Sequence, residues 1–252
     1  MNLWGISADS LKGKLPPFLP DVHTVREDFS DYLGEVKGFD LALGVLIEEL
    51  KKVGLYDNTI IAISGDHGPA GFPYGKCNLY DFGTRVSLAL SGPGIIGNRV
   101  VNDFVTLPDL APTFLESGNV EVPNVMTSKS LWPILKSNKK GIVDESRDHV
   151  LIGRERHVAR ARRGQMPYPQ RAIRTDKYLY IMNFKPDRYP LGDHYNLDTD
   201  KEANVNQLTN NTFITIPDED AGPTKAWIVK SRKDPKYKKY FSRAYGKRPS
   251  EE

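Results

Sequence analysis

The chain has 252 residues, of which 39% are hydrophobic and 27% carry a charge, a composition typical of a globular domain or of two smaller ones. The net charge of +3 is too small to indicate nucleic-acid binding by itself. No apolar run reaches the ~20 residues of a membrane span, and the single cysteine, Cys77, excludes an intrachain disulfide.

The first predicted element is a long amphipathic helix. Thr24 and Glu27 have the spacing of a capping box, apolar residues recur at helical intervals from Phe29 to Leu50, and Gly54 ends the pattern. The helix would span about 28 residues, or roughly 42 Å. Its apolar stripe predicts a sheet beside it. The residues before it contain no apolar core of the signal-peptide type.

A predicted strand at 59–64 follows, almost wholly apolar and rich in β-branched residues, as expected of a buried parallel strand. Asp66 and His67 come directly after it, and a flexible glycine-rich loop leads to Lys76. Ligand sites of open α/β sheets lie at the carboxyl ends of strands. An acid and an imidazole are good metal ligands and a lysine is a good anion ligand, although a structural Asp-His pair and an exposed lysine are the alternative.

The middle of the chain predicts short elements. A strand is expected at 86–90 and a second strand or sheet edge at 100–106. Thr106 then caps a helix that has Pro108 and Asp109 in its first turn and ends at Gly118. The polar stretch 136–148 is the predicted subdomain boundary.

The last third predicts a small antiparallel sheet, with strands at 149–153, 171–175 and 178–183. Arg154, Glu155 and His157 follow the first of these strands. Because an arginine fork binds two oxygen atoms at once, this cluster predicts either glycan recognition or an ordinary charged surface.

Two further regions complete the pattern. Residues 186–223 predict surface loops. Residues 225–248 are strongly basic with interleaved aromatic residues, which favours an amphipathic helix with a basic face over a nucleic-acid-binding element.

Several segments, in this order, resemble the sulfatase family of the alkaline phosphatase superfamily. The later ones resemble the heparan N-sulfatase (N-sulphoglucosamine sulphohydrolase) branch. The matching segments are 57–68, 75–86, 91–94, 107–116, 153–157, 171–184 and 194–200.

The resemblance implies an α/β, alkaline phosphatase-like sulfatase fold, a partial mixed sheet flanked by helices, with a small antiparallel C-terminal subdomain. Residues 1–146 would be the C-terminal portion of the catalytic domain. Residues 147–252 would be the C-terminal subdomain, incomplete because the chain stops where a fourth strand of the family's sheet would begin.

The resemblance also implies a divalent-cation site, with calcium expected ahead of zinc. Asp66 would bind the metal. His67 stands where many relatives have Asn, and it would bind either the metal or the sulfate. Lys76 would contact the sulfate, which makes Lys76 and His67 the catalytic candidates. Arg154, Glu155 and His157 would bind the sugar.

The family's nucleophile is a formylglycine made from the cysteine of a Cys-x-Pro-Ser-Arg motif. Cys77 is followed by Asn78, Leu79 and Tyr80, so it does not match. The formylglycine is therefore expected in a missing N-terminal part, and the chain alone is expected to have little or no activity.

The partner expected from the resemblance is a sulfated glycan, without nucleic acid or a membrane span, and a homodimer is left open. Family habit implies a periplasmic, secreted or lysosomal protein. Two alternatives remain. One is a zinc-dependent phosphodiesterase or phosphatase of the same superfamily, and the other is a non-catalytic module that binds anionic glycans.

Overall fold

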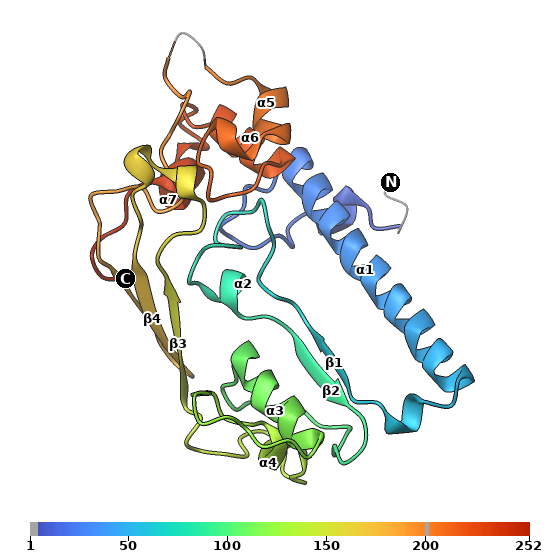
Figure 1. Ribbon diagram of the computed structural model, residues 1–252. Coiled ribbons are helices and arrows are strands. Elements are labelled where there is room, and N and C mark those ends of the chain that lie inside the picture. The colour runs from blue at the N-terminus through green and yellow to red at the C-terminus, as the bar shows by residue number, and fades with distance from the viewer. Residues whose placement is uncertain (1–4, 200–201) are drawn as a thin grey trace.

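The computed structural model describes residues 5–199 and 202–252; Asp200, the last residue of one matching segment, lies outside them. The long helix α1 (His23–Lys52) forms one side of the molecule (Figure 1). The sheet of β1 (Ile61–Ser64) and β2 (Leu88–Ser91) lies beside α1, and the sheet of β3 (His149–Arg154), β4 (Gln170–Thr175) and β5 (Leu179–Asn183) lies on the side of the molecule away from α1. The remaining α-helices are α2 (Asp81–Thr84), α3 (Leu110–Ser117), α4 (Trp132–Leu135), α5 (Val205–Asn210), α6 (Pro223–Lys230) and α7 (Lys238–Tyr245).

The helix predicted from the apolar periodicity is confirmed as α1, but the predicted capping box is wrong. The helix begins at His23, and no side chain caps its first turn. The backbone N–H of Arg26 already bonds the Val22 carbonyl at 3.0 Å, which places Thr24 inside the first turn rather than at the cap. Gly54 follows the helix with φ +70°, a conformation that glycine adopts without strain. None of the described helices is long and apolar enough to cross a membrane.

The predicted parallel pairing of the first strand is wrong. β1 pairs with β2 in the antiparallel sense, from Ile61 opposite Ser91 to Ser64 opposite Leu88. The connection between them contains the single-turn helix α2 and folds back on itself, with the Gly65 N–H bonded to the Ser87 carbonyl at 3.3 Å, so β2 returns beside β1 in the opposite direction. The strand predicted at 100–106 is also wrong, because only Val101 forms a bridge there, to Gly141.

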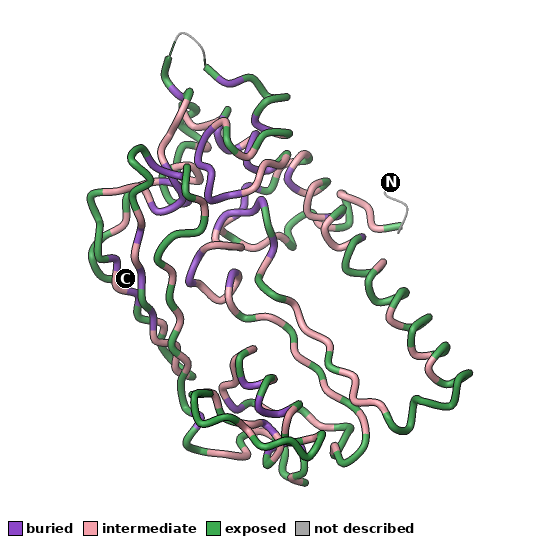
Figure 2. The backbone as a smooth tube through the Cα atoms, viewed as in Figure 1, coloured by how far each residue is buried: buried purple, intermediate pink, exposed green. Residues whose placement is uncertain are grey.

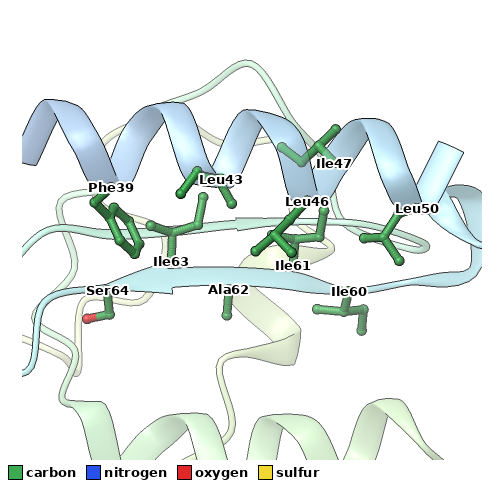
Figure 3. Close-up of a pocket in the computed structure, with 11 residues that line it drawn as sticks. Phe39, Leu43, Leu46, Ile47, Leu50, Ile60, Ile61, Ala62, Ile63 and Ser64 are labelled. Carbon is green, nitrogen blue, oxygen red and sulfur yellow. The ribbon is translucent and has the colours of Figure 1, made fainter.

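The apolar stripe of α1 faces β1 across an open cleft (Figure 3). The cleft has a volume of about 440 Å³, and its lining includes Phe39 and Leu46 from α1 and Ile61 and Ile63 from β1. Phe39 is 58% exposed and Leu46 is 63% exposed. A sheet of two strands is too narrow to cover a helix of this length, so the described residues cover the predicted stripe only in part.

The predicted antiparallel sheet is confirmed, with strand order β3-β4-β5. The last residues of the chain add to its outer edge. The backbone N–H of Asn183 donates to the Ser250 carbonyl at 2.7 Å, and Ile181 and Glu252 exchange two backbone bonds at 2.9 Å. Residues 250–252 therefore pair with β5 on the edge away from β4.

The C-terminal helices enclose a cluster of buried apolar residues, visible where buried residues concentrate in Figure 2. The single helix predicted over 225–248 is wrong, because α6 and α7 are separate helices. Pro235 lies between them, and its missing N–H cannot continue a helical hydrogen-bond pattern. Residues 215–219, predicted as surface loop, are buried beneath these helices.

Three ionisable groups lie in this core. The Tyr245 hydroxyl donates to Glu219 Oε1 at 2.5 Å, and Lys225 Nζ donates to the carbonyls of Ile216 and Glu219 at 3.0 and 2.6 Å. Burial raises the pKa of Glu219 to about 7 and lowers the pKa of Lys225 to about 8, because water no longer solvates the charged forms. Glu219 therefore keeps its proton to a higher pH in the folded protein than in the unfolded chain.

Close glycine contacts shape the loop between β1 and β2. The Gly68 N–H donates to the Gly83 carbonyl at 2.9 Å. A Cβ atom on Gly83 would lie 2.3 Å from the Gly75 carbonyl oxygen, and one on Gly68 would lie 1.8 Å from the Phe82 carbonyl oxygen. Phe72 is buried. The loop predicted to be flexible is therefore a closely packed turn structure.

We predict that Gly83→Ala destabilises the protein by at least about 2 kcal/mol, because the new methyl group would collide with backbone atoms that cannot move independently. Urea unfolding monitored by circular dichroism measures the change. Gly44→Ala, in α1 with open space around it, is the matched control and should stabilise by about 0.5–1 kcal/mol. Equal stability of the Gly83→Ala protein and the wild type would contradict the packing described.

A second prediction concerns pH. The folded-state pKa of Glu219 is raised from 4.5 to about 7, so its contribution to stability is present below about pH 4.5 and is lost as pH rises to about 7. Each unit corresponds to about 1.4 kcal/mol, so the loss is at most a few kcal/mol. Glu219→Gln, which keeps an acceptor for Tyr245, should remove this loss when unfolding free energies at about pH 5 and 7 are compared. The exposed Glu121→Gln is the control, and an unchanged pH slope in Glu219→Gln would rule out this assignment.

Candidate active site

Lys76, the predicted anion ligand, lies at the end of the glycine-rich loop beside the acidic segment 218–220. Its Nζ donates to Asp220 Oδ2 at 3.0 Å. Its side chain is 26% exposed. A lysine ammonium group has three N–H donors, so the contact with Asp220 leaves donors for a second anion. Lys76 is thus a fixed, partly exposed cation.

Arg154, at the end of β3, reaches the same loop. Its guanidinium donates to the Cys77 carbonyl and, at 2.7 Å, to the Pro190 carbonyl. Burial lowers its pKa, although arginine stays charged in proteins. The Nε atom is buried without a hydrogen-bond partner. Arg154 therefore ties the residue next to Lys76 to β3 through two of its five N–H donors.

The other two predicted sugar ligands differ in their surroundings. Glu155 is exposed and forms an ion pair with Arg171 across the β3–β4 pair. His157 is partly exposed, and its Nδ1 lies 3.8 Å from Asp218 Oδ1. His157 therefore shares the acidic segment with Lys76, whereas Glu155 lies on the face of the antiparallel sheet.

Asp218 is a buried carboxylate with several partners. It accepts from the Val158 N–H at 2.9 Å and from Arg162 at 3.1 Å, in addition to the contact with His157. Arg162 also donates to the Pro190 carbonyl at 2.6 Å, the same carbonyl that Arg154 contacts. The two arginines thus meet at one carbonyl oxygen, and Asp218 holds one of them.

Asp66 and His67 lie together where β1 ends. Asp66 is 86% exposed, and its Oδ2 lies 3.5 Å from His67 Nε2. His67 Nδ1 lies 2.8 Å from the Gly68 carbonyl oxygen. That oxygen can only accept, so Nδ1 carries the proton of the neutral ring and Nε2 keeps its lone pair. Both predicted ligands thus present metal-binding atoms to the same place.

These two residues line a second cleft of about 440 Å³, shared with Asp28, Asp31 and Glu35 of α1. Carboxylate oxygen atoms suit a hard cation such as calcium. Asp28 is already engaged, because it accepts from the Thr224 N–H at 2.9 Å. Within the described residues, no three His, Cys, Asp or Glu side chains converge closely enough to hold a metal. Asp66 and His67 fit a divalent cation by chemistry and form an incomplete ligand set.

Cys77 does not have the properties of a thiolate nucleophile. Burial raises the pKa of its thiol to about 12, so the thiolate is absent at neutral pH. Its backbone has φ +70° and its carbonyl accepts from Arg154. The residue has a structural role in the loop, and the chain's single cysteine does not fit the formylglycine position.

Sequence reasoning missed the partners that position the site, Asp218, Asp220 and Arg162. The acidic run at 218–220 was included in the region predicted as surface loop. The sequence signal was the cluster of acids at 218–220 followed closely by Lys225. A lysine that becomes buried needs hydrogen-bond partners, and Lys225 finds one in the Glu219 carbonyl. The predicted roles of Asp66, His67, Lys76, Arg154, Glu155 and His157 stay predictions.

Two family models match the chain. The model described as Sulfatase matches residues 9–120. The model described as N-sulphoglucosamine sulphohydrolase, C-terminal, matches residues 65–219, which is more than half of the chain. The two matches overlap over the glycine-rich loop that carries Lys76.

Curated relatives agree with these models. The chain is 38% identical over 124 residues to an extracellular sulfatase SULF-1 homolog of Drosophila melanogaster, covering 48% of this chain and 11% of that protein. It is 27% identical over 190 residues to N-sulphoglucosamine sulphohydrolase of Homo sapiens, covering 70% of this chain and 36% of that protein. The matched part of the chain thus spans about a tenth of the length of the first relative and a little more than a third of the length of the second.

Solved structures agree on the fold. A phosphonate monoester hydrolase from Silicibacter pomeroyi matches with a TM-score of 0.54 and 23% identity, covering 68% of this chain and 35% of that chain. A 2-O GAG sulfatase matches with a TM-score of 0.51 and 24% identity, covering 64% of this chain and 34% of that chain. The predicted alkaline phosphatase-like α/β fold is confirmed, and by the match over residues 65–219 the chain belongs to the sulfatase family.

Proposed function

We propose that this chain is the C-terminal part of a sulfatase domain that hydrolyses a sulfate ester or sulfamate on a glycan, in the manner of a heparan N-sulfatase. The observation that carries the proposal is the fixed cation Lys76, which lies on the loop that both family models cover. Its Nζ is 3.0 Å from Asp220 Oδ2. The names of relatives support the substrate class, since they include N-sulphoglucosamine sulphohydrolase and an ulvan-active sulfatase from Formosa agariphila.

In this proposal Lys76 binds a sulfate oxygen and neutralises charge that develops as the bond to sulfur breaks. A positioned cation at such a place stabilises the transition state more than the ground state. Asp220 fixes the direction of the lysine side chain, so little reorganisation is required when the anion binds. Arg154, which contacts the same loop, and His157, which contacts the acidic segment, would bind the attached sugar.

Asp66 and His67 would hold a divalent cation, with calcium ahead of zinc because a carboxylate oxygen is the better exposed donor. The bound cation would withdraw electron density from the sulfate oxygen atoms. In the neutral tautomer, in which Nδ1 donates to the Gly68 carbonyl, Nε2 would be the atom that binds the cation; with both nitrogen atoms protonated, His67 would instead donate a hydrogen bond to the sulfate.

The nucleophile is proposed to lie in a part of the domain outside this chain. Cys77 does not fit it, and the apolar cleft between α1 and β1 fits further polypeptide of the same domain. An apolar surface of this kind is usually covered in a folded protein. On this proposal the 252-residue chain alone has no sulfatase activity, and the complete protein acts in a periplasmic, secreted or lysosomal compartment.

We predict that sulfate is released from sulfated heparin disaccharides only by a protein extended upstream to include a Cys-x-Pro-Ser-Arg segment and made in a host that oxidises that cysteine. Asp66→Ala in the extended protein should lower the rate at least about 100-fold, because a charge-stabilising group is lost. It should also abolish any calcium-dependent rise in melting temperature. Asp57→Ala, an exposed acid outside the site, is the control.

Two outcomes would contradict this proposal. Release of sulfate by the 252-residue chain itself would show that the nucleophile is present in it. Zinc-dependent cleavage of a phosphodiester without release of sulfate would instead favour the phosphodiesterase alternative, for which an Asp-His pair is a suitable ligand set.

A further inference from the structure

The last helix and its flanks carry a row of cations that the proposed site does not use. We define the α7 basic surface as Lys236, Lys238, Lys239, Arg243 and Lys247, all of which are exposed. Lys239 and Arg243 are one helical turn apart on α7, with Lys236 before the helix and Lys247 after it. Positive charge therefore lines one side of this helix.

These five cations have no carboxylate in ion-pair range among the described residues, whereas the basic residues around them do. Arg232 contacts Glu202 at 2.9 Å and Asp198 at 3.1 Å, and Arg248 contacts Glu252 at 3.4 Å. Like charges one turn apart on a helix repel each other. A row of unpaired cations beside paired ones indicates a surface that an external polyanion can stabilise.

The end of helix α7 contacts the loop that carries Lys76. The Tyr74 hydroxyl donates to the Arg243 carbonyl at 3.1 Å, and the Arg248 guanidinium lies 5.3 Å from the Tyr74 ring centroid. Tyr74 is two residues before Lys76. A polymer lying along α7 would therefore reach the loop of the proposed sulfate site.

The tyrosines of this surface are engaged and do not offer faces to nucleic-acid bases. Lys236 lies over the Tyr237 ring at 4.9 Å, and that ring also packs edge-on against Trp227 at 4.8 Å. The Tyr189 ring stacks on His194 at 3.9 Å and lies under Lys247 at 5.6 Å. Single-stranded nucleic acid binds chiefly where bases stack on open aromatic rings, so this surface favours a polyanion held by charge alone.

We propose that the α7 basic surface binds a sulfated polysaccharide outside the active site and holds the chain of sugars next to Lys76. The charge row carries the inference that a polyanion binds. The choice of sulfate as the anion rests on the proposed function. Ammonium and guanidinium groups bind sulfate oxygen atoms through charge-assisted hydrogen bonds, which depend on ionic strength at an exposed surface.

The test measures the affinity of the 252-residue chain for a heparin oligosaccharide at low salt by calorimetry. The variant Lys236→Gln, Lys239→Gln, Lys247→Gln should bind at least about tenfold more weakly, since three attractive charges are removed. The control variant, Lys136→Gln, Lys139→Gln, Lys140→Gln, removes the same charge from exposed lysines, one of which also lies over an aromatic ring, at 5.0 Å from Trp132. It should bind within about twofold of wild type.

Three results would overturn the inference: no binding of heparin by the wild type, equal weakening in both variants, or equal affinity for fully desulfated heparin. Circular dichroism and thermal unfolding establish that each variant is folded. Absence of heparin binding by the wild-type chain, together with sulfate release by the extended protein, would refute this surface and leave the proposed function standing. Heparin binding without any hydrolysis would remove the proposed function alone.

Discussion

A buried carboxylate, Asp218, is the constraint on which the candidate site depends. It holds Arg162, and Arg162 shares the Pro190 carbonyl with Arg154, which in turn holds the Cys77 carbonyl next to Lys76. Lys76 then contacts Asp220, two residues from Asp218. These contacts form a closed ring between the glycine-rich loop, the end of β3 and the acidic segment. A buried charge that loses its partner costs about 3–5 kcal/mol, so the ring is strongly specified.

The candidate site contains two sets of side chains, one on the ring and one at the end of β1. Lys76, Arg154 and His157 gather on the side of the acidic segment, where a fixed cation can bind an anion. Asp66 and His67 lie at the strand end beside the acidic residues of α1, where oxygen donors can bind a cation. The loop that joins the two groups contains glycines whose backbones are in close contact. Main-chain packing therefore sets the distance between Asp66 and Lys76. In the proposed function both groups would act on one sulfate, and a fixed separation would keep them oriented toward it.

Local patterns in the sequence predicted much of this arrangement. Helical periodicity located α1, and alternation located β3, β4 and β5. Thr106 stands at the start of a helix as predicted, and its N–H donates to Asp109 Oδ2 at 3.0 Å. Whether β1 pairs parallel or antiparallel depends on its neighbour, which an apolar run does not specify, so that prediction failed. The roles of Asp218 and Asp220 were missed because their partners are distant in the chain: Arg162 and Val158 bind one, and Lys76 binds the other. A charged residue is predicted to be exposed unless such a partner is known.

The most direct test of this account is site-resolved amide hydrogen exchange on Arg154→Met, which keeps the bulk of the side chain but removes its bonds to the Cys77 and Pro190 carbonyls. If the ring fixes the loop, the amides of Lys76 and Asn78 should exchange at least about tenfold faster, while the Ile181 amide in β5 keeps its protection. Unchanged exchange at Lys76 and Asn78 would contradict the account, because the loop would then be held without the ring.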